Sequence, residues 1–106
     1  MSARTVRWHN NFCDTMLMNE RLVQRLERLK IPQDWTSRRG QLVPVILLDD
    51  LFAYCKRQGW SVAARNGIDG GWCASVGGNT IHYAEGRTLV RALALAVLDA
   101  TGKEKP

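Results

Sequence analysis

The stretch that decides the fold is residues 71–102, GWCASVGGNTIHYAEGRTLVRALALAVLDATG. Two short runs, 72–76 and 80–84, alternate apolar and polar side chains, which is typical of β-strands. Between them lies the turn GGN, and after them comes a segment rich in alanine and leucine. Thr88 is placed to cap that segment and Gly102 to end it, so the pattern predicts a helix from 88 to 101. The stretch therefore predicts two antiparallel strands followed by a helix.

The residues before this stretch extend the pattern. Residues 60–65, WSVAAR, alternate in the same way, and the glycine-rich turn 66–71 connects them to residues 72–76. A helix is predicted from 44 to 58, because Pro44 suits a first helical turn and Gly59 a C-cap. Its predicted apolar face consists of Leu48, Leu51, Phe52 and Cys55.

An amphipathic helix is predicted over residues 14–30, with a loop at 31–43. Its apolar stripe consists of Met18, Leu22, Leu26 and Leu29. If the monomer left this stripe uncovered, it would pair two chains, so a homodimer through this helix stays open. The fold expected is α+β: a three-stranded antiparallel meander packed with helices, in α-αβββα order. Residues 1–106 are expected to form a single domain, with 1–43 as an added module, 44–102 as the core and 103–106 as a frayed tail.

Composition favours a protein that folds without a metal or disulfide. With 45% apolar residues and four tryptophans, a chain of 106 residues can bury a core. Cys13, Cys55 and Cys73 are odd in number and lack metal-ligand spacing, which suits a reducing cytoplasm. The first 16 residues lack the apolar segment of a signal peptide, and the longest apolar stretch, 89–98, is too short to span a membrane. We therefore expect a cytoplasmic protein without cofactors or membrane contacts.

The charge of +5 lies mostly in the front of the chain, where residues 1–59 contain ten basic and six acidic side chains. Three arginines recur at steps of four and three along the first predicted helix, and two more follow Trp35. Arginine and tryptophan are enriched at the centres of protein interfaces, and both can contact nucleic acids. The predicted partner-binding residues are Arg21, Arg25, Arg28, Trp35, Arg38 and Arg39. A solvated helix face, with Trp35 in the core, is the competing interpretation.

No catalytic constellation is visible in the sequence. His9 and His82 lack neighbouring metal ligands, and the alternation of 80–84 predicts that His82 faces solvent. Cys73 has no base nearby in sequence to activate it. Asp49 and Asp50 point about 100° apart on a helix, so they suit its positive end better than a paired site. We predict neither catalysis nor metal binding, although convergence of His82, Cys73 and a carboxylate in one pocket would favour an enzyme.

A set of structural residues lies between positions 45 and 102: Gly59, Trp60, Val62, Trp72, Thr88, Leu89, Ala92, Leu93, Ala96, Leu98, Ala100 and Gly102. In these residues the segment resembles the phage ABA sandwich domain. The resemblance implies a phage or mobile-element accessory protein, a class without a common enzymatic activity. Together with the basic surface, it predicts a protein that binds and blocks a partner, such as an anti-CRISPR inhibitor of a host defence complex, in the host cytoplasm.

The predicted helix, three strands and helix also resemble a double-stranded RNA-binding domain. That family contacts phosphates through lysines at the start of its last helix. This sequence has Arg87 and Arg91 there, with Leu89 and Val90 between them. The resemblance implies nucleic-acid binding, which is the alternative function for the predicted basic surface.

Overall fold

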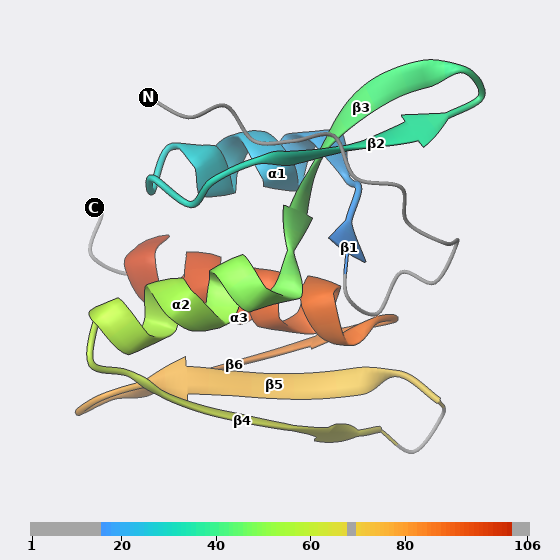
Figure 1. The fold of residues 1–106 in the computed structure, drawn as a ribbon. Helices are drawn as coiled ribbons and strands as arrows, with labels where there is room; N and C mark the ends of the chain where they lie inside the picture. The colour runs from blue at the N-terminus through green and yellow to red at the C-terminus, as the bar shows by residue number, and fades with distance from the viewer. Residues whose placement is uncertain (1–15, 68–69, 103–106) are drawn as a thin grey trace.

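The computed structural model describes residues 16–67 and 70–102. Within these ranges the chain forms two three-stranded antiparallel sheets and three helices, which confirms the α+β class (Figure 1). The elements are β1 (Met16–Leu17), α1 (Glu20–Glu27), β2 (Asp34–Arg38), β3 (Gln41–Leu47), α2 (Leu48–Arg57), β4 (Ser61–Asn66), β5 (Trp72–Gly77), β6 (Ile81–Gly86) and α3 (Leu89–Gly102). The predicted order of elements lacked β1, β2 and β3.

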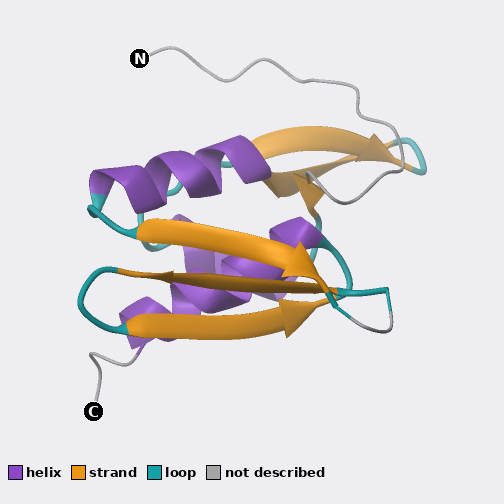
Figure 2. Ribbon diagram, turned by 90° about the horizontal axis from the view of Figure 1, so that it is seen from below, coloured by secondary structure: helices purple, strands orange, loops and turns teal. Residues whose placement is uncertain are grey.

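The sheet of β4, β5 and β6 has one covered and one uncovered face. Its strands lie in chain order, and Ala74 at its centre is opposite Ala64 on one side and Ala84 on the other. Helices α2 and α3 both lie against the same face, as two views at right angles show (Figures 1 and 2). Ala74 and Val76 point to the helices and are buried. In the described part of the chain, no helix or strand packs on the outer face.

The sides of β6 are the reverse of what we predicted for His82. Ile81 and Tyr83 are 61% and 51% exposed on the outer face, whereas the side chain of His82 is only 13% exposed. The cross-strand register explains the difference, because it places His82 opposite the buried Val76. The apolar pattern of β6 would have buried Ile81 and Tyr83, but the pairing with β5 decides which face is covered and places His82 and Ala84 on it instead.

Two glycines allow backbone segments to approach closely in this half of the molecule. Gly77 has a φ of 149° at the β5–β6 turn, and a Cβ there would collide with the carbonyl oxygen of Thr80. A Cβ on Gly86 would lie 2.8 Å from the backbone nitrogen of Ala92 in α3. Only glycine allows the turn and the helix to approach so closely.

The predicted loop at 31–43 was wrong, because residues 34–38 and 41–47 form the hairpin of β2 and β3. The predicted start of the second helix at Pro44 was also wrong, since Pro44 lies in β3 opposite Trp35 and α2 begins at Leu48. Strand β1 pairs with β3 only at Ile46 and Leu47, so among the described residues no strand lies beside β3 on that side at Pro44. A proline is tolerated there because no ladder hydrogen bond is lost on that side.

The hairpin escaped sequence analysis because its buried side is partly polar. Asp34 and Thr36 are both buried, and they alternate with the half-buried Trp35 and Ser37. A pattern search that looks for alternating apolar residues does not find such a strand.

Helix α1 is shorter than predicted, and its apolar stripe is covered within the monomer. Asn19 caps it by accepting a hydrogen bond from the backbone N–H of Leu22 at 3.1 Å. Leu22, Val23 and Leu26 are buried in the same cluster as Leu93 and Val97 of α3. Leu22 and Leu26 of the stripe are therefore covered, Met18 and Leu29 are half-buried, and the homodimer stays a prediction. Residues of the predicted module and core share one buried cluster.

The N-terminal residues 1–15, with Cys13 and His9, and the predicted frayed tail at 103–106 lie outside the described residues. In the described part of the chain, no helix combines the length and apolar character needed to cross a membrane.

Candidate functional site

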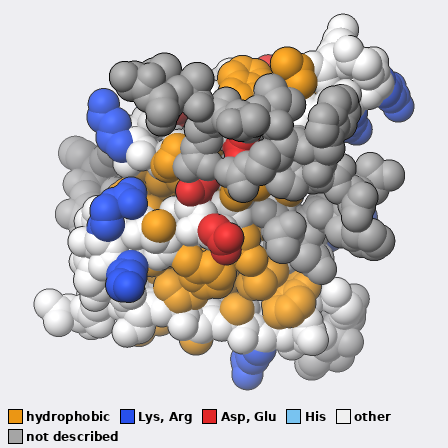
Figure 3. Space-filling model, in the orientation of Figure 1, with side chains coloured by type: hydrophobic (Ala, Val, Ile, Leu, Met, Phe, Trp, Pro, Cys, Tyr) orange, Lys and Arg blue, Asp and Glu red, His pale blue; other side chains and the backbone are white. Residues whose placement is uncertain are grey.

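The structure divides the predicted basic surface into two sets. Arg21 and Arg25 are exposed on α1, and Arg28 is its exposed C-cap residue. Arg38 ends β2 and Arg39, with a φ of 52°, lies in the turn at the tip of the hairpin. The hairpin tip points away from the C-terminal end of α1 (Figure 1). In the same orientation, Lys and Arg side chains occupy separate places on the surface (Figure 3).

Strand β2 is the cause of this separation. At roughly 3.3 Å per residue, its five residues carry the tip arginines well away from the loop that follows α1. A coil at 31–43, as predicted, could have folded back onto the helix. All five arginines are exposed, but they do not form one continuous patch.

Trp35 is half-buried. It is therefore neither a core residue nor fully exposed for binding, the two alternatives that the sequence left open. It shares one face of the hairpin with Pro44, its cross-strand partner, and with Leu42, which lies two pairs further along, opposite Ser37. Leu42 is 55% exposed. We call Trp35, Leu42 and Pro44, together with Arg39 in the turn at the tip, the hairpin patch. Arg38 alternates to the other face of β2, the face of Asp34 and Thr36.

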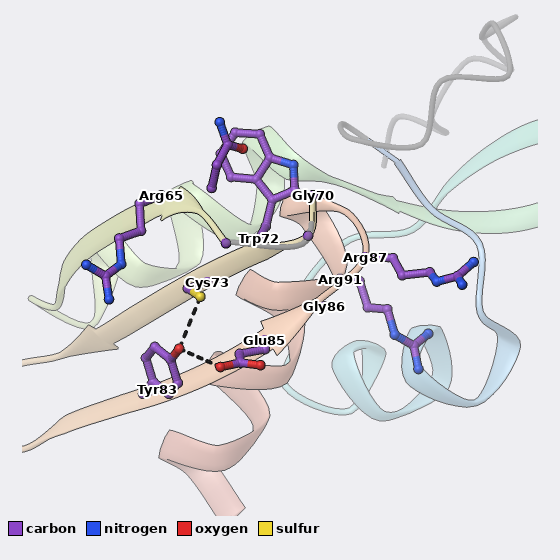
Figure 4. A pocket seen from close by; sticks show the side chains of 12 residues that line it. Arg65, Gly70, Trp72, Cys73, Tyr83, Glu85, Gly86, Arg87 and Arg91 are labelled. Carbon is purple, nitrogen blue, oxygen red and sulfur yellow. Dashed lines mark hydrogen bonds between the residues drawn. The ribbon is translucent and has the colours of Figure 1, made fainter.

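A second surface, which the predicted site residues did not include, is an open groove at one end of the β4–β5–β6 sheet (Figure 4). Its volume is about 1240 Å³. We call it the arginine groove; its main side chains are Arg65, Trp72, Cys73, Tyr83, Glu85, Arg87 and Arg91. In the close view, Arg65 lies on one side of Tyr83 and Glu85, and Arg87 and Arg91 lie on the other (Figure 4).

The strand register brings these residues together. Asn66 at the end of β4 is opposite Trp72, which in turn is opposite Gly86 at the end of β6. Arg65 and Arg87 each lie one residue from this row, and Arg91 follows in the first turns of α3. Sequence analysis noted Arg87 and Arg91 only in a family comparison. Had the expected three strands been aligned residue by residue, Arg65 would have fallen at the same end of the sheet as Arg87, which would have indicated the groove.

On the outer face of the sheet, the hydroxyl of Tyr83 lies within hydrogen-bonding distance of Cys73 and Glu85. It donates to Oε2 of Glu85 at 2.7 Å and approaches Sγ of Cys73 at 3.1 Å. The hydrogen bonds with Cys73 and Glu85 hold the pKa of the Tyr83 hydroxyl above its ordinary value. The phenol therefore keeps its proton at neutral pH, and the hydrogen bonds orient its ring.

His82 belongs to the opposite face. Its Nδ1 lies 3.1 Å from Oδ2 of Asp99 in the last turn of α3, on the face of the sheet that the helices cover. Cys73 points to the outer face, as expected from its alternation with Trp72 and Ala74. His82 and Cys73 therefore do not converge with a carboxylate in one pocket, the arrangement that would have favoured nucleophilic catalysis.

The environments of Cys55, Asp49 and Asp50 are explained by the fold. Burial raises the pKa of the Cys55 thiol to about 11, which keeps it in the unreactive protonated form. Asp49 and Asp50 lie in the first turn of α2, where carboxylates complement the helix dipole. Among residues 16–67 and 70–102, no group of three or more potential metal ligands comes together.

Comparisons with protein-family models, with curated proteins and with solved structures find no match for this chain. The hairpin patch and the arginine groove are therefore the two features from which a function is inferred.

Proposed function

We propose that this protein is a non-enzymatic binding protein that blocks a protein partner through its hairpin patch. The observation that carries the proposal is the exposure of Leu42, 55%, beside a half-buried tryptophan on a projecting hairpin. Tryptophan and arginine are enriched among the few residues that dominate the binding energy of protein interfaces, and these cluster near the interface centre. The hairpin patch combines Trp35 and the exposed Leu42 with Arg39 at the tip of the hairpin.

Charge indicates the kind of partner. The chain has a net charge of +5, and both tip arginines are exposed. An acidic protein surface with an apolar recess would complement the hairpin patch. The exposed arginines of α1, Arg21, Arg25 and Arg28, lie apart from the patch, so we assign them a role in long-range attraction. Their separation from Arg38 and Arg39 favours a protein partner over nucleic acid for the predicted basic surface.

Two further observations support an inhibitory accessory protein. The resemblance of residues 45–102 to the phage ABA sandwich domain points to a phage or mobile-element protein, for which an anti-CRISPR-like inhibitor acting in the host cytoplasm is the most concrete form. The placement of His82 and Cys73 on opposite faces of the sheet supports a non-enzymatic role.

The proposal is tested by affinity capture from nuclease-treated bacterial lysate with three immobilised proteins. These are the wild type, Leu42→Asp, and Ile81→Asp as a matched control at an exposed apolar residue outside the hairpin patch. We expect one protein to be retained by the wild type and the control and lost with Leu42→Asp. The purified partner should then bind wild type with a fixed stoichiometry. Retention of the same proteins by all three columns would refute the hairpin patch as the binding surface.

A further inference from the structure

The arginine groove contains positive charges that are not paired with carboxylates in the described part of the chain. Among the described residues that line it are three arginines and one glutamate, whose side chains carry two net positive charges. In the described part of the chain, Arg65, Arg87 and Arg91 form no salt bridge with a carboxylate. Guanidinium groups that face a groove without a carboxylate partner are suited to bind an external anion, above all phosphate.

The arrangement of the arginines selects an extended anion. Arg65 comes from β4, whereas Arg87 and Arg91 come from the other side of the sheet end, across Tyr83 and Glu85 (Figure 4). A single phosphate cannot contact guanidinium groups that are spread across an open groove. A chain of phosphates can contact each in turn, because it follows the groove around the end of the sheet.

Tyr83 adds a flat surface inside the same groove. The residue is 51% exposed, and its hydroxyl is held by Cys73 and Glu85. An exposed, oriented aromatic ring is the platform on which proteins stack unpaired bases. In a duplex the faces of the bases are covered by their neighbours, so a single strand is the form that can use this ring. The Glu85 carboxylate beside Tyr83 repels phosphate, so the base and not the backbone is expected there.

We propose that the arginine groove binds single-stranded nucleic acid, with successive phosphates on Arg65, Arg87 and Arg91 and a base stacked on Tyr83. This site is separate from the hairpin patch, with which it shares no residue. It uses arginines other than those of the predicted basic surface.

The test is fluorescence anisotropy with the full chain and labelled mixed-sequence oligonucleotides of about 12 nucleotides, a length within the site sizes of single-strand-binding proteins. Single-stranded RNA, single-stranded DNA and duplex DNA are titrated across a range of salt concentrations. The wild type should bind one or both single strands more tightly than the duplex. The tighter of the two identifies the natural polymer.

Two triple variants with equal loss of charge separate a specific site from general attraction. Arg65→Ala, Arg87→Ala and Arg91→Ala together should lower affinity at least about tenfold and reduce the log–log salt slope by about two, since each phosphate contact to a single strand contributes about 0.7. The matched variant Arg21→Ala, Arg25→Ala and Arg28→Ala should keep the slope of the wild type. Should the groove triple variant fail to fold, Arg65→Ala and Arg87→Ala, each at an exposed position, should each lower the slope by about 0.7.

Stacking is tested by two substitutions of Tyr83. Tyr83→Ala should weaken binding several-fold, whereas Tyr83→Phe, which keeps the ring, should bind nearly as well as the wild type. The proposal is overturned if the wild type binds no single strand at low salt, if both triple variants lose affinity equally, or if the duplex binds as tightly as the single strands. Leu42→Asp should leave nucleic-acid binding unchanged, so failure of either proposed surface can be distinguished from failure of the other.

Discussion

The two halves of this molecule build their sheets in different ways. In residues 48–102, three strands of six residues pair along their full length, and an apolar face packs against two helices. In residues 16–47, β3 pairs with β2 over five residues and with β1 over two, and the buried positions include Asp34 and Thr36. The comparison teaches that a regular apolar alternation marks a sheet in the sequence, whereas a sheet with polar buried positions becomes visible only through its pairing.

The candidate sites follow the same division. The hairpin patch belongs to the irregular half, where a short ribbon projects and exposes Leu42. The arginine groove lies at the end of the regular sheet, where turns and a helix start meet. One surface is apolar with charged edges and the other is charged with an aromatic centre, so we expect different partners for them.

The largest expected effect tests whether the two halves share one core. Leu26 in α1 is fully buried in the cluster that includes Leu93 of α3. Leu26→Ala should lower the free energy of unfolding by about 2–5 kcal/mol, as large-to-small changes in cores do. Urea unfolding followed by tryptophan fluorescence and by circular dichroism should remain a single transition. Two separate transitions would show that the halves unfold independently.

The next effect compares two turns, one from each half. Gly77→Ala places a Cβ against the carbonyl oxygen of Thr80 at a positive φ, so it should destabilise by about 3 kcal/mol. Gly40, in the β2–β3 turn, also has a positive φ but has open space around it, so Gly40→Ala should lose only about 1 kcal/mol. Both values are obtained from urea midpoints. Equal losses would mean that backbone conformation alone, and not close packing, distinguishes the turns.

A smaller effect is expected from pH. Burial raises the pKa of Cys55 in α2 from 9.0 to about 11, so the folded state binds this proton more tightly than the unfolded state. The resulting contribution to stability is complete below pH 9 and decreases as the pH rises from 9 to 11. Wild type should therefore lose more stability than Cys55→Ala between these pH values. If the two proteins lose stability in parallel, ionisation of Cys55 is not linked to unfolding.

The smallest effect on stability is expected at the hairpin patch. Leu42→Asp should change the free energy of unfolding by no more than about 0.5 kcal/mol, because an exposed side chain loses little packing. The same change should abolish capture of the protein partner. A large loss of stability, measured by urea unfolding, would instead show that Leu42 contributes to the fold.

Sequence analysis predicted the regular half more accurately than the irregular one. The predicted strands at 60–65 and 72–76 lie within one residue of β4 and β5, and the predicted helix at 88–101 lies within one residue of α3. These elements have local markers: period-2 alternation, glycine turns and a Thr88 cap whose hydroxyl accepts from the backbone N–H of Arg91. The β2–β3 hairpin has Gly40 in its turn but lacks the regular apolar alternation, and Pro44 resembled a helix start and Asp34 a loop residue.

The sequence by itself determined the α+β class, the regular strands and the exposure of the arginines, because alternation, caps and charge are properties of neighbouring residues. Only the tertiary structure decided which face of β6 is buried, how far Arg38 lies from Arg28, and that Arg65 shares a groove with Arg87 and Arg91. The physical reason is that strand register connects residues distant in the chain. A shift of one residue in that register exchanges the two faces of a strand.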